Sequence, residues 1–204
     1  MTAGLTFEAL QQSPLTLARE IDFASGERAL LRPLVATDRE RLGRYFAELS
    51  SETRGRFGPH AFDQATADRL CDTIDPSQVL RVVATLEGGA EQRIVAYFIL
   101  MFSVTPHEAA RFAERGVVLD GDRDCTLAPS VADDYQNTGL GSRVMPYLFW
   151  LATGLGRRAV VLLGGTQATN ARAIHFYRKH GFREVGAFEA PQGVGNLDMM
   201  AFLR

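Results

Sequence analysis

The stretch of residues 125–142 reads CTLAPSVADDYQNTGLGS, and the rest of the chain is organised around it. It begins as a strand, crosses an acidic turn, and reaches a glycine-spaced loop that opens a helix. Glycines at positions 139 and 141 leave room for a ligand and let successive backbone N–H groups point the same way. Because the helix adds the positive end of its dipole, the stretch predicts an anion site suited to a phosphate or pyrophosphate.

Two common nucleotide-binding signatures do not fit this loop. The dinucleotide fingerprint G-x-G-x-x-G/A requires a third small residue, but Val144 stands at that position. Residues 159–162, where its ribose-binding carboxylate is expected, are apolar. A Walker loop requires Gly-Lys-Ser/Thr, and the only lysine of the chain is Lys179. The spacing that remains is Q-x-x-G-x-G, from Gln136 to Gly141.

Length and composition indicate one ordinary globular domain. The chain has 204 residues, of which 46% are hydrophobic and 23% are charged. Its 24 acidic residues nearly balance its 22 basic residues. Nucleic-acid-binding proteins usually carry a basic excess, so we expect no nucleic-acid partner.

Cysteine and histidine spacing indicates neither a disulfide framework nor a metal site, and we assign no metal. The N-terminus shows no signal-peptide pattern. The longest apolar run, residues 94–104, is shorter than the ~20 residues that cross a bilayer. We therefore expect a soluble, cytoplasmic protein without a membrane partner.

Hydrophobic periodicity divides the chain into an N-terminal extension, residues 1–26, and a domain, residues 27–204. Strands are predicted at residues 29–35, 79–86, 94–104, 126–131, 159–163, 182–188 and 197–203. Helices are predicted at residues 38–49, 65–74, 107–115, 140–155 and 170–180. Residues 105–124 form an insertion between two strands. Pro129 removes one ladder hydrogen bond from its strand and predicts a bulge or a parting of strands.

A second motif, NARAIHFYRKHGF, occupies residues 170–182. Together with the loop and the order of elements, it resembles the GNAT superfamily of acetyl-CoA-dependent N-acetyltransferases, from about residue 29 to the C-terminus. The resemblance implies an α/β fold (α+β in some classifications). Its central mixed, mostly antiparallel sheet would have splayed middle strands and flanking helices. Pro129 on one strand and the Gly164–Gly165 pair on the other would weaken the ladder at the same level.

The resemblance also implies acetyl-CoA as co-substrate, with its pyrophosphate on the loop backbone. Tyr177 stands where the family usually has a phenol near the thioester sulfur. A phenol, with an ordinary pKa of about 10, can donate a proton to the departing thiolate; the alternative is a core aromatic. The positions implied as cofactor-binding are Ser130, Val131, Gln136, Asn137, Thr138, Gly139, Leu140, Gly141, Ser142 and Asn170.

The implied reaction is direct attack on the acetyl carbonyl by a primary amine of a small molecule or protein. Deprotonating a lysine-like amine at pH 7 costs ~4–5 kcal/mol, so a general base or water relay is expected. Relatives often carry Glu or His at the positions of Cys125 and Leu127, and aim a backbone N–H at the acetyl oxygen where Pro129 stands. Asp124 is the nearest carboxylate, but strand alternation turns it away. The alternative function is a catalytically inactive GNAT-fold module that binds acyl-CoA or regulates a partner.

Two segments are candidates for the acceptor side. Residues 53–57 would line it, with Arg54 and Arg56 available to an acidic group of the acceptor; a solvated loop is the alternative. The insertion would form a lid that brings His107 and its carboxylates to the amine. Otherwise it is a packing patch around Phe112 that closes a gap or a homodimer interface.

Overall fold

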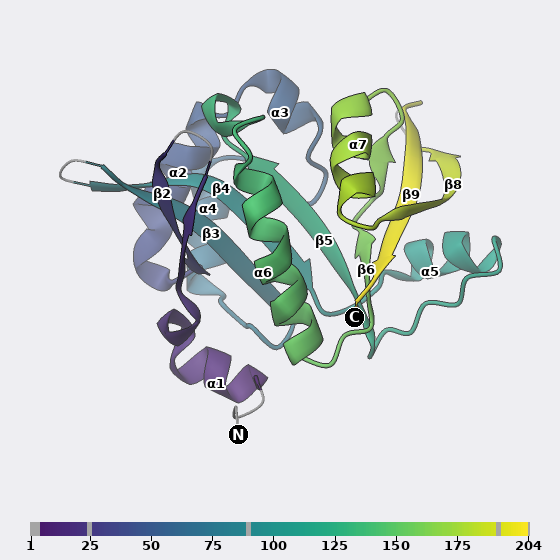
Figure 1. Cartoon of the computed structure of the whole chain (residues 1–204), viewed down its shortest axis with the longest axis horizontal. Helices are drawn as coiled ribbons and strands as arrows, with labels where there is room; N and C mark the ends of the chain where they lie inside the picture. Colours follow the sequence, from purple (N-terminus) through teal and green to yellow (C-terminus); the bar gives the residue numbers. More distant parts are fainter. Residues whose placement is uncertain (1–4, 24–25, 89–90, 191–192, 204) are drawn as a thin grey trace.

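The computed structural model describes residues 5–23, 26–88, 91–190 and 193–203. These residues form one nine-stranded sheet in the order β1-β2-β3-β4-β5-β6-β9-β7, with β8 also pairing β9 (Figure 1). The β5–β6 pair is parallel and the other pairs are antiparallel. The expected fold class, a mixed and mostly antiparallel sheet flanked by helices, is confirmed.

The strands are β1 (Arg19–Asp22), β2 (Arg28–Pro33), β3 (Val79–Gly88), β4 (Glu91–Met101), β5 (Asp124–Val131), β6 (Ala159–Leu162), β7 (Thr166–Gln167), β8 (Arg183–Glu189) and β9 (Gly195–Phe202). The α-helices are α1 (Phe7–Gln12), α2 (Arg39–Glu48), α3 (Ser51–Gly55), α4 (Gln64–Asp72), α5 (Pro106–Ala113), α6 (Leu140–Gly154) and α7 (Ala171–Lys179). Short 3₁₀ turns lie at Pro14–Leu17, Ala36–Asp38 and Asp133–Tyr135.

Two apolar clusters cover the two faces of the sheet. On one face α6 buries the stripe predicted from its helical period, with Val144, Leu148 and Leu151 against the strands. On the other face α2 and α4 bury Leu42 and Leu70. Figure 1 shows α6 crossing the front of the sheet, with α2 and α4 behind it. The sheet is therefore the middle layer, and its central strands are covered on both sides.

The segment expected as an N-terminal extension contributes to this domain. Its strand β1 pairs β2 at the edge of the sheet, and Leu10 and Leu17 are buried in the α6-side cluster. Strand β1 was not predicted because it has four residues, with Ile21 as its apolar residue, and so shows no detectable alternation of apolar and polar positions.

The middle strands β5 and β6 part as the two breakers predicted. Their parallel register runs only from Asp124↔Ala159 to Leu127↔Leu162, and a last hydrogen bond joins Leu163 N–H to the Leu127 carbonyl at 3.0 Å. Beyond it, Gly165 has a φ of +71°, and a Cβ there would lie 2.6 Å from the Leu197 carbonyl oxygen. Only glycine fits this turn, which leads the chain away from β5.

The insertion packs against the sheet beyond β6. Phe112 of α5 is fully buried in a separate small cluster. Its buried partners are Ala159, Val161 and Met200. Glu108 is also buried, and its Oε1 accepts a hydrogen bond of 2.9 Å from the N–H of Gly164. The insertion thus holds the turn at which β6 leaves β5.

A buried ion pair fixes α5 to β9 and gives a stability prediction. Arg111 donates two hydrogen bonds, of 3.0 and 2.8 Å, to fully buried Asp198, and Arg115 approaches the same carboxylate at 3.4 Å. We expect Arg111→Met to lower the unfolding free energy by about 3 kcal/mol, because it leaves a buried charge with one distant partner.

Unfolding in urea, monitored by circular dichroism, measures this change in the unfolding free energy. The matched control is Arg28→Met, which removes an arginine from exposed ion pairs with Glu20 and Asp22 and should change stability little. Equal effects of the two substitutions would contradict the assigned role of the Arg111–Asp198 pair.

Candidate functional site

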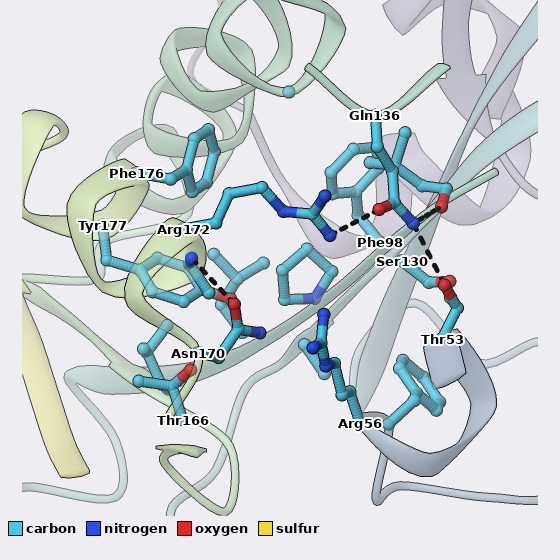
Figure 2. A pocket seen from close by; sticks show the side chains of 18 of the residues that line it. Thr53, Arg56, Phe98, Ser130, Gln136, Thr166, Asn170, Arg172, Phe176 and Tyr177 are labelled. Atoms are coloured by element: carbon cyan, nitrogen blue, oxygen red, sulfur yellow. Dashed lines mark hydrogen bonds between the residues drawn. The ribbon is translucent and has the colours of Figure 1, made fainter. Parts of the chain in front are cut away.

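A cleft of about 430 Å³ opens where β5 and β6 part. Its walls are the unpaired end of β5, the glycine loop before α6, the inner face of α7, and the segments of α3 and β7 across from them (Figure 2). The sequence motifs at residues 125–142 and 170–182 therefore meet in one site, as predicted.

The glycine loop presents unpaired donors to this cleft. Gly139 precedes α6 with a left-handed φ of 89°, and no acidic residue or side-chain cap occupies the first turn of the helix. The first intrahelical bond runs from Arg143 N–H to the Gly139 carbonyl at 3.1 Å. In the described part of the chain, the preceding N–H groups of Leu140, Gly141 and Ser142 have no backbone acceptor. They form the positive end of the helix and can bind an anion.

The other residues of the loop hold its backbone in this conformation. The Thr138 hydroxyl donates to the Tyr135 carbonyl at 2.8 Å and holds the turn. The Leu140 side chain is buried in the core, so only its N–H faces a ligand. A Cβ at Gly141 would lie 3.2 Å from the Phe176 ring. Glycine at this position thus also permits the close packing of α7 on the loop.

The open edge of β5 has a defined set of backbone groups. Ala132 N–H bonds the Val95 carbonyl of β4, and the Leu127 carbonyl accepts from the β6 side. N–H and C=O groups alternate between the two sides of a strand. Ser130 therefore directs its backbone N–H and C=O to β4, although the residue lines the cleft, and its role in cofactor binding stays a prediction. The backbones of Pro129 and Val131 face the opening. Pro129 has no N–H, so Val131 supplies the first free N–H along the edge of β5 after Leu127.

Gln136 ties three walls of the cleft together. Its Nε2 donates to the Thr53 hydroxyl and the Val131 carbonyl, both at 3.1 Å, and its Oε1 accepts from Arg172. Figure 2 shows this bridge across the mouth of the cleft. The amide is occupied by protein partners and holds these walls in place, and contact of Gln136 with the cofactor stays a prediction.

Helix α7 supplies Asn170 and Tyr177. Asn170 caps the helix with Oδ1, which accepts from Ala173 N–H at 3.1 Å, and its Nδ2 remains available to the cleft. The Tyr177 ring packs on Phe182 and extends from α7 into the cleft. In the described part of the chain its hydroxyl has no hydrogen-bond partner, and burial raises the pKa of the phenol. The Tyr177 ring is thus buried, and its hydroxyl, whose pKa is raised, stays protonated beside the cleft.

The cleft lining is cationic. Among the described lining residues are Arg56, Arg172 and Lys179, and none is Asp or Glu. Asp124 is buried against Arg158 at 2.9 Å, which agrees with the expectation that it turns away. Arg54 points elsewhere as well: its guanidinium donates to the backbone carbonyls of Ala47, Leu49 and Phe62.

The insertion does not reach this cleft. None of residues 105–124 is part of its lining; His107 is exposed and Glu108 is bound to the backbone of Gly164. The lid expectation is therefore wrong, and the packing alternative describes the contacts. The packing patch around Phe112 was the alternative expectation, whereas the pairing of Arg111 with Asp198 was not expected from the sequence.

Thr166, Arg172 and Lys179 are among the lining residues that sequence reasoning missed. Arg172 and Lys179 carry a detectable signal, because they lie on the helix that follows Asn170. Thr166 follows the Gly164–Gly165 turn, and only the path of that turn brings it to the cleft.

The described residues contain no group of three or more His, Cys, Asp or Glu side chains able to hold a metal ion. No described helix has both the length and the apolar character needed to cross a bilayer.

Comparison with known proteins adds the family. Residues 89–184 match the family model of the acetyltransferase (GNAT) domain, which spans both motifs. No match was found among curated proteins. The family match over these residues and the shared fold confirm the resemblance to the GNAT superfamily that the sequence predicted.

Solved structures share this fold at low sequence identity. The GNAT domain of S. lividans PAT is 18% identical with a TM-score of 0.73, over 93% of this chain and 99% of that chain. A GCN5-related N-acetyltransferase from Kribbella flavida is 19% identical with a TM-score of 0.62, over 85% and 96%. The ribosomal-protein-S18-alanine N-acetyltransferase from Escherichia coli is 21% identical with a TM-score of 0.54, over 85% and 92%. These similarities concern the fold.

Proposed function

We propose that this chain is an N-acetyltransferase that moves an acetyl group from acetyl-CoA to a primary amine of a small molecule or protein. One observation carries the proposal. The free N–H groups at the start of α6 and the Tyr177 hydroxyl face one cleft, which opens at the parting of β5 and β6.

The residues of the cleft fit the parts of acetyl-CoA. The N–H groups of residues 140–142 would bind the pyrophosphate, and Arg172 and Lys179 would balance further phosphate charge. Val131 N–H on the open edge of β5 and Nδ2 of Asn170 on the opposite side would bind the amide groups of the pantetheine arm. Acetyl-CoA itself supplies an activated thioester carbonyl.

Tyr177 would provide acid catalysis. The phenol, whose pKa is raised by burial, keeps its proton at neutral pH and can deliver it to the sulfur as the carbon–sulfur bond breaks. Cys125 and Leu127 stand where relatives often carry an acid or histidine, and no described carboxylate lines the cleft. The amine proton would therefore leave through water, or the amine would bind already neutral.

This absence of a base predicts the pH dependence of the reaction. We expect kcat/KM to rise about tenfold per pH unit up to the pKa of the amine, because only the neutral amine attacks. Tyr177 adds no falling limb below pH 9, since its pKa is raised above the ordinary value near 10. Initial rates between pH 6.5 and 9 with one acceptor measure the slope. A plateau that begins well below the pKa of the amine would contradict the proposal and indicate a protein base.

A second candidate function rests on a different observation. Pro129 leaves the open edge of β5 without an N–H between Leu127 and Val131, and no lining carboxylate replaces the missing base. A GNAT-fold module that binds acetyl-CoA without transferring the acetyl group accounts for both features.

A thiol-release assay separates the two functions. The protein is incubated with acetyl-CoA and pools of amino acids, polyamines, aminoglycosides and lysine peptides, while calorimetry measures acetyl-CoA binding. Amine-dependent release of CoA supports the transferase. Tight binding of acetyl-CoA with no release above the amine-free rate in any pool supports the inactive module.

A further inference from the structure

We infer that the acceptor is a small primary amine that also carries a carboxylate, as amino acids do, and that Arg56 binds this carboxylate. The inference rests on the proposed acetyl transfer and names the substrate class of the same cleft.

The cations of the cleft fall into two groups. Arg172 contacts Gln136 of the glycine loop. Lys179 is adjacent to His180, whose Nε2 lies 3.2 Å from the Ser142 hydroxyl. Arg172 therefore lies beside the glycine loop, and Lys179 lines the same cleft from the last turn of α7. Arg56 extends into the cleft from the opposite wall, which α3 forms (Figure 2). It is not among the residues proposed to bind the phosphates of acetyl-CoA.

Arg56 can exchange its present partner for a ligand. Its described ion pair is with Glu52 at 2.6 Å, and the side chains are 33% and 70% exposed. Exposed ion pairs of this kind contribute little stability. A guanidinium binds a carboxylate through two parallel hydrogen bonds, with more specificity than a lysine ammonium. A carboxylate that enters the cleft can therefore replace Glu52.

The rest of the cleft disfavours cationic acceptors. A diamine or aminoglycoside brings ammonium groups, and no described lining residue is an acid that could receive them. Burying an unpaired charge is costly. Repulsion from Arg56 adds to this cost, so a polycation should bind more weakly than a carboxylate-bearing amine of equal length.

The space beside Arg56 favours a small acceptor. Gln167 Nε2 of β7 donates to the Gly55 carbonyl at 3.3 Å, directly before Arg56, and joins the two walls at this side. The cleft of about 430 Å³ must also hold the pantetheine arm. An amino acid fits this description better than a folded protein terminus.

The test uses acceptors of equal length that differ in charge. Amino acids of the series H₂N–(CH₂)n–COO⁻ are compared with their primary amides and with diamines in the thiol-release assay. We expect KM for the carboxylate to be about 10–100-fold below KM for the amide, and the diamine to be the poorest acceptor. A diamine or an amide that equals the carboxylate would overturn the inference.

Substitutions assign the effect to Arg56. Arg56→Gln should raise KM about 10–100-fold for the carboxylate acceptor and leave KM for the amide within about twofold. Glu52→Gln frees the guanidinium and should lower KM for the carboxylate, and Arg28→Gln on the distant strand β2 is the matched control. Equal effects of Arg56→Gln on both acceptors would contradict the assignment.

Failure of the inference is distinguishable from failure of the proposed function. If acetyl-CoA binds but no amine releases CoA, the transferase proposal fails. In that case calorimetry with CoA-saturated protein still tests whether the amino acid binds more tightly than its amide and whether Arg56→Gln removes the difference. A short peptide with a lower KM than the amino acid would overturn the assignment to a small molecule.

Discussion

Tyr177→Phe is expected to lower the acetyl-transfer turnover by ~10²–10⁴-fold and to leave acetyl-CoA affinity nearly unchanged. The substitution keeps the ring in contact with Phe182 and removes only the hydroxyl that would protonate the departing thiolate. Because the buried phenol has a raised pKa, the wild-type protein holds this proton throughout the neutral range. Stopped or continuous thiol-release assays give turnover, and calorimetry gives the affinity.

A matched tyrosine controls for the loss of any buried hydroxyl. Tyr147 of α6 is as buried as Tyr177, but its hydroxyl donates to the Leu17 carbonyl at 2.9 Å, away from the cleft. Tyr147→Phe should lower stability by about 1 kcal/mol and leave turnover unchanged. If the two variants lose activity equally, or if Tyr177→Phe keeps full turnover, Tyr177 is only a core aromatic.

Replacing Gly139 and Gly141 together by valine should lower acetyl-CoA affinity at least ~100-fold. Gly139 has a φ of 89°, which a β-branched residue adopts only with strain of roughly 1–2 kcal/mol. A Cβ at Gly141 would lie 3.2 Å from Phe176, so the loop must also shift. Both changes move or cover the N–H groups that would bind the pyrophosphate. Calorimetric titration with acetyl-CoA measures the loss.

The control variant, Gly116→Val, introduces a similar backbone strain at a glycine outside the cleft. Gly116 has a φ of +75°, and a Cβ there meets nothing within 4 Å. Gly116→Val should therefore destabilise the fold through strain alone and leave acetyl-CoA affinity unchanged. A folded Gly139→Val/Gly141→Val protein that binds acetyl-CoA like the wild type would exclude the glycine loop as the phosphate site.

Much of the fold was predictable because its signals are local. The apolar stripe of α6 follows the helical period, and Asn170 and Gly181 bracket α7 as a cap and a stop. The parting of β5 and β6 was predictable from Pro129 and the double glycine, since each residue weakens a ladder by its own chemistry.

Short elements escaped prediction because distant residues hold them in place. Helix α3 lies in a segment rich in helix breakers. Asp133, about 80 positions along the chain, bonds Ser50 and Thr53 at its start. The two residues of β7 form a strand only because β9 pairs with them. Such partners are distant along the chain, so the local sequence pattern does not predict them.

The sequence by itself determined the family resemblance, the anion loop and the candidate acid, because each depends on residue types at fixed spacing. Only the tertiary structure decided which side chains face the cleft. Arg54 and Arg56 look equivalent in the sequence, yet side chains two positions apart in a helical turn point roughly 200° apart. Arg54 therefore turns back to the carbonyls of its own loop, and Arg56 reaches the cleft.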